Sequence, residues 1–159
     1  MTKNAMNASD GALRPADLPC RSESHPPHPS HSGQLSVLII EDISDIGLAR
    51  TLPLERRGFD VAVAASHEEG VERAVRGEPD VIVLDLGPRD LDGIGVIRVL
   101  RSVPMTREIP FVILTDQEPH GIERVVRGWQ VVRHVLKKPV AGDQLARIIS
   151  TLSDADSVR

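Results

Sequence analysis

Apolar residues along this chain gather in short continuous runs, separated by longer stretches in which apolar and polar positions alternate. Five of the runs predict β-strands, at residues 35–40, 60–64, 80–85, 110–115 and 131–136. Val, Ile and Leu dominate the first, third and fourth runs, which is typical of parallel strands that helices cover on both faces. The pattern therefore predicts a buried parallel sheet.

The stretches that follow these runs have helical periodicity. Residues 44–58 predict a first helix with Pro53 as a kink or break inside it, and Ser66 with Glu69 forms a capping box that opens a second. Apolar residues at positions 94, 97 and 100 mark a third. The last two helices carry apolar stripes at i, i+3, i+4 and i+7: Ile122, Val125, Val126 and Trp129, then Leu145, Ile148, Ile149 and Leu152. Five strand–helix units predict an α/β fold with a doubly wound, five-stranded parallel sheet.

Residues 35–152 account for one domain. Residues 1–34 contain five of the twelve prolines and three of the six histidines and show no apolar period, so we expect a disordered extension there. Residues 153–159 form a short C-terminal tail. The histidines of the extension stand among prolines without a carboxylate or thiolate partner, and we assign them no metal chemistry.

Composition narrows the classes of function. Of the 159 residues 40% are hydrophobic, yet no apolar run approaches the length of a membrane span. One cysteine, Cys20, excludes a disulfide framework and favours a cytoplasmic protein. A formal charge of −4 and three aromatic residues argue against direct binding of nucleic acid.

Chemistry-bearing residues end four of the five predicted strands. Glu41 and Asp42 follow the first strand, Asp85 ends the third, Thr115 the fourth, and Lys138 follows the fifth. Ligands of open parallel sheets bind outside the carboxyl ends of the strands, so these groups should converge. Three close carboxylates repel one another unless a cation lies among them, and Mg²⁺ prefers such oxygen ligands. Asp85 is the best placed nucleophile toward a phosphoryl group, and Lys138 and Thr115 are suited to contact its oxygens. Taken singly, each carboxylate also fits a purely structural role at a helix or strand end.

The segments VLIIED, VIVLDLGPRDLDG, VILT and LKKP, in this order, resemble the receiver domain of bacterial two-component response regulators, in particular the stand-alone receivers similar to chemotaxis regulators. The separations of 43 residues from Asp42 to Asp85, 30 to Thr115 and 23 to Lys138 are also close to those of the family. The resemblance spans residues 35–152 and implies a flavodoxin-like (βα)5 fold.

The resemblance also implies roles for the site residues. Asp85 would accept a phosphoryl group from a sensor histidine kinase or a histidine phosphotransfer protein. Glu41, Asp42, Asp85 and the main-chain carbonyl of Gly87 would bind Mg²⁺. Thr115 would be the switch hydroxyl, and Lys138 would pair with the phosphoryl group before a cis peptide bond to Pro139. A downstream protein would bind the face formed by the fourth helix, fifth strand and fifth helix.

Four features depart from the family pattern. Asp116 follows the switch hydroxyl, where a small residue is usual, and adds negative charge beside the site. Val135 replaces the aromatic residue that usually reports the switch. Arg89 stands at the customary position of the loop proline, which is Pro88 here. Gly128, Trp129 and Gln130 lie where small residues are common, and Trp129 suits either the core or a partner surface.

Three other interpretations remain beside the phosphorylated receiver. A degenerate receiver would keep the fold and bind partners without phosphorylation. A Mg²⁺-dependent phosphohydrolase would use Asp85 as its nucleophile, but Gly87 stands where that class needs its acid/base aspartate. A flavin or nucleotide site lacks its glycine-rich phosphate loop. We therefore expect a phosphoacceptor with at most self-catalysed chemistry rather than an enzyme.

Overall fold

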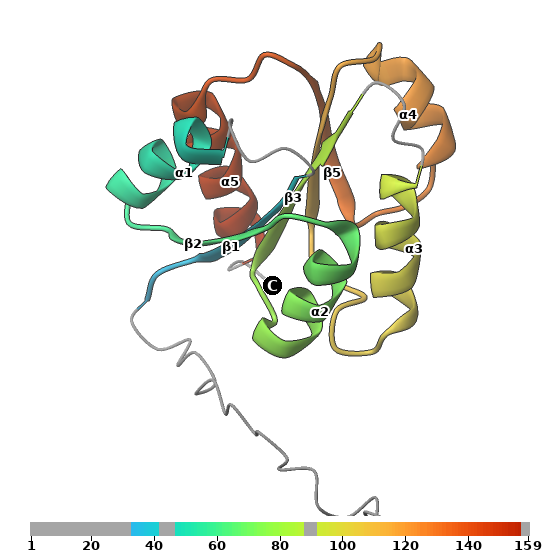
Figure 1. Ribbon diagram of the computed structural model, residues 1–159, viewed down its shortest axis with the longest axis horizontal. Coiled ribbons are helices and arrows are strands. Elements are labelled where there is room, and N and C mark those ends of the chain that lie inside the picture. Colours follow the sequence, from blue (N-terminus) through green and yellow to red (C-terminus); the bar gives the residue numbers. More distant parts are fainter. Residues whose placement is uncertain (1–32, 42–46, 88–91, 157–159) are drawn as a thin grey trace, which may run out of the picture.

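The computed structural model describes residues 33–41, 47–87 and 92–156, which form one sheet with helices on both of its faces (Figure 1). The strands are β1 (Ser36–Ile40), β2 (Asp60–Ala64), β3 (Val81–Leu86), β4 (Phe111–Thr115) and β5 (Val132–Lys137). The helices are α1 (Gly47–Arg56), α2 (His67–Gly77), α3 (Gly93–Ser102), α4 (Pro119–Val125) and α5 (Gly142–Asp156). Each predicted strand is present, with ends that differ by no more than one residue.

All strand pairs in the sheet are parallel, and the strand order is β2-β1-β3-β4-β5. The chain therefore reverses its winding direction between β1 and β3, which are neighbours although β2 separates them in sequence. This order is the flavodoxin-like one, and the predicted fold class is confirmed. The crevice of such a sheet opens at the carboxyl ends of β1 and β3.

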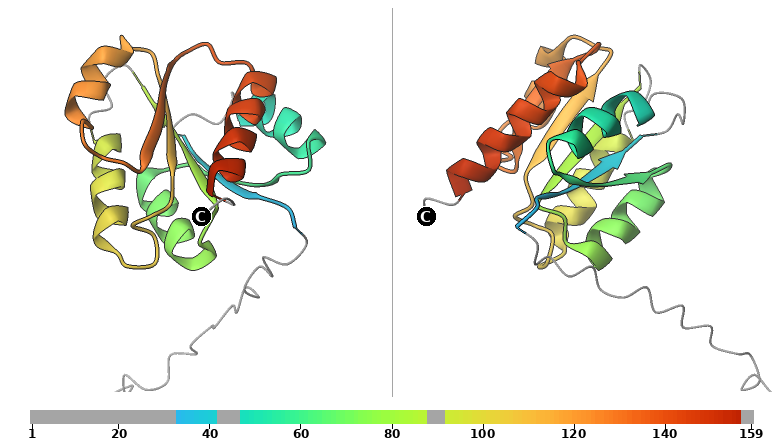
Figure 2. Two further views of the ribbon diagram at one scale, coloured as in Figure 1. Left: turned by 180° about the vertical axis from the view of Figure 1, so that it is seen from behind. Right: turned by 90° about the vertical axis from the view of Figure 1, so that its left-hand side faces the viewer.

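Alternate residues of the central strands enter two separate apolar clusters. Ile39, Val83 and Leu114 pack against α1 and α5 on one face, where Leu54 and Leu145 are fully buried. On the other face, residues such as Ile40, Leu84 and Ile113 pack against α2, α3 and α4. Figure 2 shows α5 and α2 on opposite sides of the strands. Aliphatic side chains thus dominate both layers, as expected for a sequence with only three aromatic residues.

Local signals explain where two helices begin and end. The Ser66 hydroxyl accepts a hydrogen bond from the N–H of Glu69 at 3.1 Å, and the Glu69 carboxylate accepts one from the N–H of Ala65 at 2.9 Å. The predicted capping box therefore opens α2. The end of α1 is a Schellman motif in which Gly58 has φ +85° and the N–H of Phe59 bonds the carbonyl of Leu54.

The prediction for the fourth helix is wrong at its carboxyl end. α4 ends at Val125, so Trp129 lies beyond the helix instead of completing its apolar stripe, and Val125 is exposed. Gly128, in the turn that follows α4, has φ +81°, a left-handed conformation that glycine adopts readily. Trp129 nevertheless packs against the core cluster of α3 and α4, which favours the structural interpretation of this residue.

Two other helices differ from prediction in smaller ways. α1 continues through Pro53 to Arg56, so Pro53 does not break it. The ring of Pro53 lies against α5, where a Cβ placed on Gly142 would stand 2.5 Å from Cγ of the proline. α5 continues to Asp156, four residues past the last position of its apolar stripe. No helix in the described part of the chain is both long enough and apolar enough to span a membrane.

Several sequence predictions concern residues outside the described ranges. They are the extension over residues 1–32, Asp42, the loop residues Pro88 and Arg89, and the last three residues of the tail. These remain predictions from the sequence.

Candidate functional site

Two carboxylates lie where the winding direction of the sheet reverses. Glu41 directly follows β1, and its N–H continues the ladder by bonding the carbonyl of Ala64 at 3.1 Å. Asp85 is the penultimate residue of the neighbouring strand β3. Both residues are buried, with 4% and 8% of their surfaces exposed. Because β1 and β3 are parallel neighbours, the sheet brings these two carboxylates to one edge, as the sequence predicts.

Lys138 reaches this edge from the end of β5. Its Nζ donates to Oδ1 of Asp85 at 2.6 Å and lies 2.8 Å from Oδ2 of Asp116. Burial alone lowers the pKa of Lys138, but hydrogen bonds from its ammonium to Asp116 and Asp85, together with their charges, outweigh burial and raise this pKa above its usual value. Lys138 is therefore a fixed positive charge at neutral pH, shared between two carboxylates.

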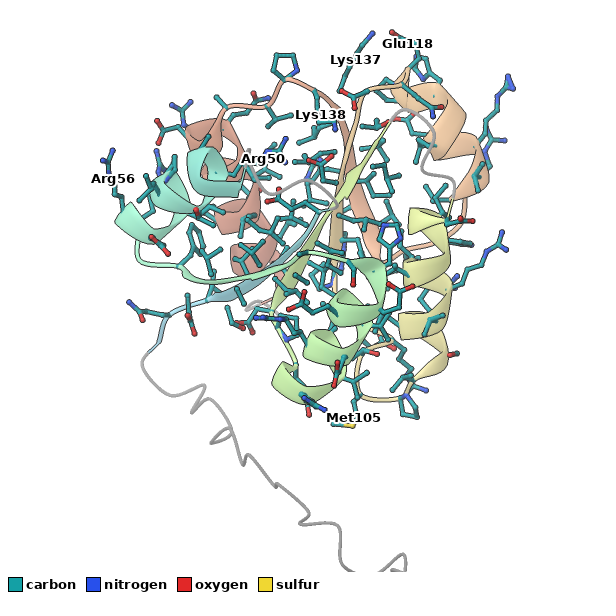
Figure 3. The ribbon with its side chains drawn as sticks, in the orientation of Figure 1. Arg50, Arg56, Met105, Glu118, Lys137 and Lys138 are labelled. Carbon is teal, nitrogen blue, oxygen red and sulfur yellow. The ribbon has the colours of Figure 1, made fainter. Side chains whose placement is uncertain are left out.

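Arg50 is a second cation in the site, and the sequence analysis did not identify it. Its Nη1 donates to Oδ2 of Asp85 and lies 3.4 Å from Oε2 of Glu41. The Arg50 side chain is only 6% exposed. Burial raises the pKa of Glu41, whereas the charge of Arg50 opposes that rise. Figure 3 shows Arg50 and Lys138 approaching the same edge of the sheet from α1 and β5.

The helical spacing of the sequence places Arg50 on the inward face of α1. Arg50 stands four residues before Leu54, which is fully buried, so both side chains share the inward face of α1. A charged residue on an inward face needs an opposite charge nearby. Periodicity identifies such a position, but the partner carboxylates come from other elements, and only the packing of α1 on the sheet identifies them.

Thr115 ends β4 and is fully buried. Its register partner on β3 is Leu86, the residue after Asp85, so the two predicted site residues occupy adjacent strands at the same edge. The Thr115 hydroxyl accepts a hydrogen bond from the N–H of Gln117 at 3.1 Å, and the Thr115 carbonyl accepts one from the N–H of Lys138 at 2.8 Å. The following peptide bond, from Lys138 to Pro139, is cis, as the resemblance implies.

The described part of the site has oxygen ligands suited to Mg²⁺, but few of them. Glu41 and Asp85 offer carboxylates, and Gly87, which is half-buried, follows β3 directly. Among the described residues, no group of three His, Cys, Asp or Glu side chains is arranged to hold a metal ion. Asp42, the third predicted carboxylate, lies outside those residues. The donor chemistry fits Mg²⁺, while Arg50 occupies oxygens of both described carboxylates.

Residues 37–150 match the family model of the response regulator receiver domain. The chain belongs to this family. The match covers the described strands except Ser36, the first residue of β1, and all of the site residues that the sequence predicts. Receiver domains act as phosphoacceptors in two-component signalling, so the family assignment places this chain in that kind of pathway.

Similar proteins include regulators about twice the length of the matched region and one protein that the match covers almost completely. The transcriptional regulatory protein AfsQ1 of Streptomyces coelicolor is 38% identical over 118 residues, covering 74% of this chain and 51% of that protein. PrrA of Mycobacterium tuberculosis is 33% identical over 66% of this chain and 46% of its own length. The chain thus spans about half the length of these regulators. Protein PilH of Pseudomonas aeruginosa is 31% identical over 73% of this chain, and 95% of PilH is covered.

Solved structures support the same fold. Chemotaxis protein CheY4 of Vibrio cholerae superposes with a TM-score of 0.67 at 20% identity, over 74% of this chain and 98% of that one. A response regulator receiver domain from Clostridium thermocellum gives a TM-score of 0.68 at 23% identity, over 78% and 98% of the two chains. At these identities the likeness concerns the fold.

Proposed function

We propose that this receiver accepts a phosphoryl group on Asp85 from the phosphohistidine of a sensor histidine kinase or a histidine phosphotransfer protein. The observation that carries the proposal is the contact between Asp85 Oδ1 and the ammonium of Lys138, 2.6 Å apart at the carboxyl edge of the sheet. A buried carboxylate whose negative charge is matched by a lysine is suited to hold a phosphoryl group, since the same lysine can neutralise the incoming oxygens.

In the proposed reaction, a carboxylate oxygen of Asp85 attacks phosphorus while the bond from phosphorus to the imidazole nitrogen of the donor breaks. The electron pair of that bond stays on the imidazole, and Asp85 becomes an acyl phosphate. The ammonium of Lys138, which contacts the Asp85 carboxylate before the transfer, contacts the phosphoryl oxygens after it. Before phosphorylation, the Thr115 hydroxyl accepts a hydrogen bond from the N–H of Gln117. After phosphorylation, the same hydroxyl donates a hydrogen bond to a phosphoryl oxygen.

We propose Mg²⁺ as the cofactor of this step. Glu41 and Asp85 would hold the ion together with Asp42 and the main-chain carbonyl of Gly87. When bound, Mg²⁺ neutralises charge on the group being transferred. The chain itself contributes Lys138, which orients the acceptor, and the burial of Asp85, which keeps bulk water from the carboxylate.

The proposed output surface is the face formed by α4, β5 and α5. A shallow hollow lies between α4 and β5 and is lined by residues that include Glu123, Trp129, Arg133 and Val135. Val135 packs against the core cluster, in register with Ile113 of β4. Valine has no aromatic ring whose rotation could transmit the change. We therefore expect movement of Thr115 to alter the α4–β5–α5 face through the backbone of β4 and β5.

We also propose that this receiver works in the cytoplasm and delivers its signal by binding a downstream protein. The chain spans only about half of AfsQ1 and PrrA, so their role as transcriptional regulatory proteins is not transferred to it.

A second candidate function is a receiver that binds partners without phosphorylation. One observation favours it: in the described structure both oxygens of Asp85 already accept from cations, Oδ1 from Lys138 and Oδ2 from Arg50. A carboxylate paired on both sides is a weaker nucleophile, because each hydrogen bond stabilises its charge.

Intact-mass spectrometry after incubation with Mg²⁺ and acetyl phosphate tests the proposal. We expect the wild type to gain one phosphoryl mass and Asp85→Asn to gain none. Asp92→Asn is the matched control, because Asp92 is exposed at the start of α3 and makes no capping hydrogen bond, and it should gain the same mass as the wild type. Absence of the adduct from the wild type, from Asp92→Asn and from Asp116→Ala would favour the phosphorylation-independent receiver.

A further inference from the structure

Arg50 lies between the two described carboxylates of the site. One nitrogen, Nη1, contacts both Asp85 Oδ2 and Glu41 Oε2. Lys138 occupies the remaining oxygen of Asp85. The guanidinium therefore bridges the carboxylate that follows β1 and the carboxylate that ends β3.

Arg50 contributes a planar guanidinium with several N–H donors, which suits it to contact two carboxylates at once. The side chains of Arg50, Glu41 and Asp85 are each at least 90% buried. Arg50 contacts both buried carboxylates, whereas Lys138 is shared between Asp85 and the partly exposed Asp116. Two buried carboxylates in proximity are strongly unfavourable without opposite charges, so Arg50 stabilises the site when no metal ion is bound.

A divalent cation at Glu41 and Asp85 would need oxygens that Arg50 now contacts. It would also lie within a few ångströms of the guanidinium, where like charges repel strongly in a buried environment. Both effects act in the same direction. Binding of the ion therefore disfavours the Arg50 contacts, and the Arg50 contacts disfavour binding of the ion.

We propose that Arg50 is a built-in counter-ion that competes with a divalent cation for Glu41 and Asp85. This inference rests on the proposed function, since it concerns the metal site of the phosphoacceptor. It makes the receiver a poor Mg²⁺ binder at rest, because every binding event must displace a buried arginine. Metal occupancy is then set by the position of α1, which carries Arg50.

Calorimetric titration of the full chain with MgCl₂ measures the competition directly. Arg50→Met keeps a long side chain without charge, and we expect it to bind Mg²⁺ about tenfold more tightly than the wild type, or better. Arg56→Met is the matched control. Arg56 lies on the same helix, is exposed and points away from the site in Figure 3, so its substitution removes the same net charge and should leave affinity within about twofold of the wild type.

Thermal unfolding in EDTA and in Mg²⁺ provides a second comparison. Arg50→Met leaves two buried carboxylates with fewer cations, so we expect its melting temperature to be low in EDTA and to rise with Mg²⁺, whereas that of the wild type changes little. Equal Mg²⁺ affinity of the wild type and Arg50→Met would overturn the competition. So would failure of both proteins to bind the ion.

A third measurement needs no variant and applies even if Arg50→Met does not fold. In a Mg²⁺ titration of the wild type followed by NMR, the Nε–H signal of Arg50 should shift in step with the amides of Glu41 and Asp85. Shifts of those amides with an unchanged Arg50 signal would overturn the proposal.

The mass-spectrometric assay separates this proposal from the proposed function. Tighter Mg²⁺ binding by Arg50→Met, with no phosphoryl adduct on either protein, would support the competition and contradict the phosphoacceptor function. An adduct on Asp85, with equal affinities for Mg²⁺, would support the function and overturn the competition.

Discussion

The ammonium of Lys138 lies 2.8 Å from the carboxylate of Asp116, the residue that directly follows Thr115, the proposed switch hydroxyl. Asp116 is about half exposed, while Lys138 is largely buried. The pair therefore places an additional negative charge at the mouth of the site, on the cation that is expected to receive the phosphoryl oxygens. Sequence alone shows that Asp116 is near the site, and the structure shows that it binds Lys138.

Removing Asp116 should accelerate phosphorylation. In Asp116→Ala, Lys138 no longer divides its charge, so we expect the rate of adduct formation with acetyl phosphate to rise about two- to fivefold, the range that one partly exposed ion pair provides. Time-resolved intact-mass spectrometry gives the rate. Glu118→Ala is the control, since Glu118 is also exposed but pairs with Lys137, and it should leave the rate unchanged. A slower Asp116→Ala protein would show that Asp116 assists the reaction.

Gly70 is required by close packing of α2 on β1. A Cβ at this position would stand 2.5 Å from Cδ1 and 2.8 Å from Cγ2 of Ile40, which is fully buried and has no room to move. We expect Gly70→Ala to lower the free energy of unfolding by about 1–3 kcal/mol in urea denaturation. Gly95→Ala in α3 meets no atom within 4 Å and should be neutral or stabilising by up to about 1 kcal/mol. Equal stability of the two variants would contradict the packing argument.

The capping box of α2 should contribute measurably to stability. Ser66→Ala removes the oxygen that accepts the N–H of Glu69, and the expected loss is about 1 kcal/mol in the free energy of unfolding. Ser150→Ala serves for comparison, because the Ser150 hydroxyl donates to a carbonyl within α5 and caps no helix end. A loss for Ser150→Ala as large as for Ser66→Ala would argue against a specific capping effect.

The capping box of Ser66 and Glu69 also predicts that the free energy of unfolding depends on pH. The N–H of Ala65, and secondarily Arg73, lower the pKa of Glu69 below its usual value in the folded protein. Folding therefore favours the ionised form, and the stabilisation is complete above the ordinary pKa and is lost as the pH falls through the folded one. The unfolding free energies of the wild type and Glu69→Gln should differ near pH 7 and converge as the pH falls below the ordinary pKa of a glutamate. A difference that stays constant over this range would exclude the carboxylate as its source.

The single tryptophan reports on the contact between α3 and the segment after α4. The guanidinium of Arg101 lies 5.0 Å from the centre of the Trp129 ring, and that of Arg98 lies 5.7 Å away. Arg101→Ala should expose one face of the ring, so we expect a red shift of the fluorescence and stronger quenching by acrylamide. Arg107→Ala, which removes an exposed arginine paired with Glu108, should change neither.

The elements and the edge where the site lies follow from signals within the sequence. Residues 81–84 are a local run of Val, Ile and Leu, and the hydrogen bonds of the capping box lie within residues 65–69. The order of elements then fixes the winding of the sheet, and with it the convergence of Glu41, Asp85 and Lys138. These signals lie in short sequence patterns or in the order of the elements, so they can be recognised from the sequence.

The pairing of side chains depends on how the helices pack on the sheet. Arg50 on α1, which packs against α5 and β2, reaches Asp85 on β3 although the two lie 35 positions apart in sequence. Likewise, α4 ends at Val125 and a turn containing the left-handed Gly128 follows, so Trp129 lies outside a helix that its spacing favours. Ion pairs between elements depend on how the helices pack on the sheet, and a periodic pattern contains the direction of each side chain but not the identity of its neighbour.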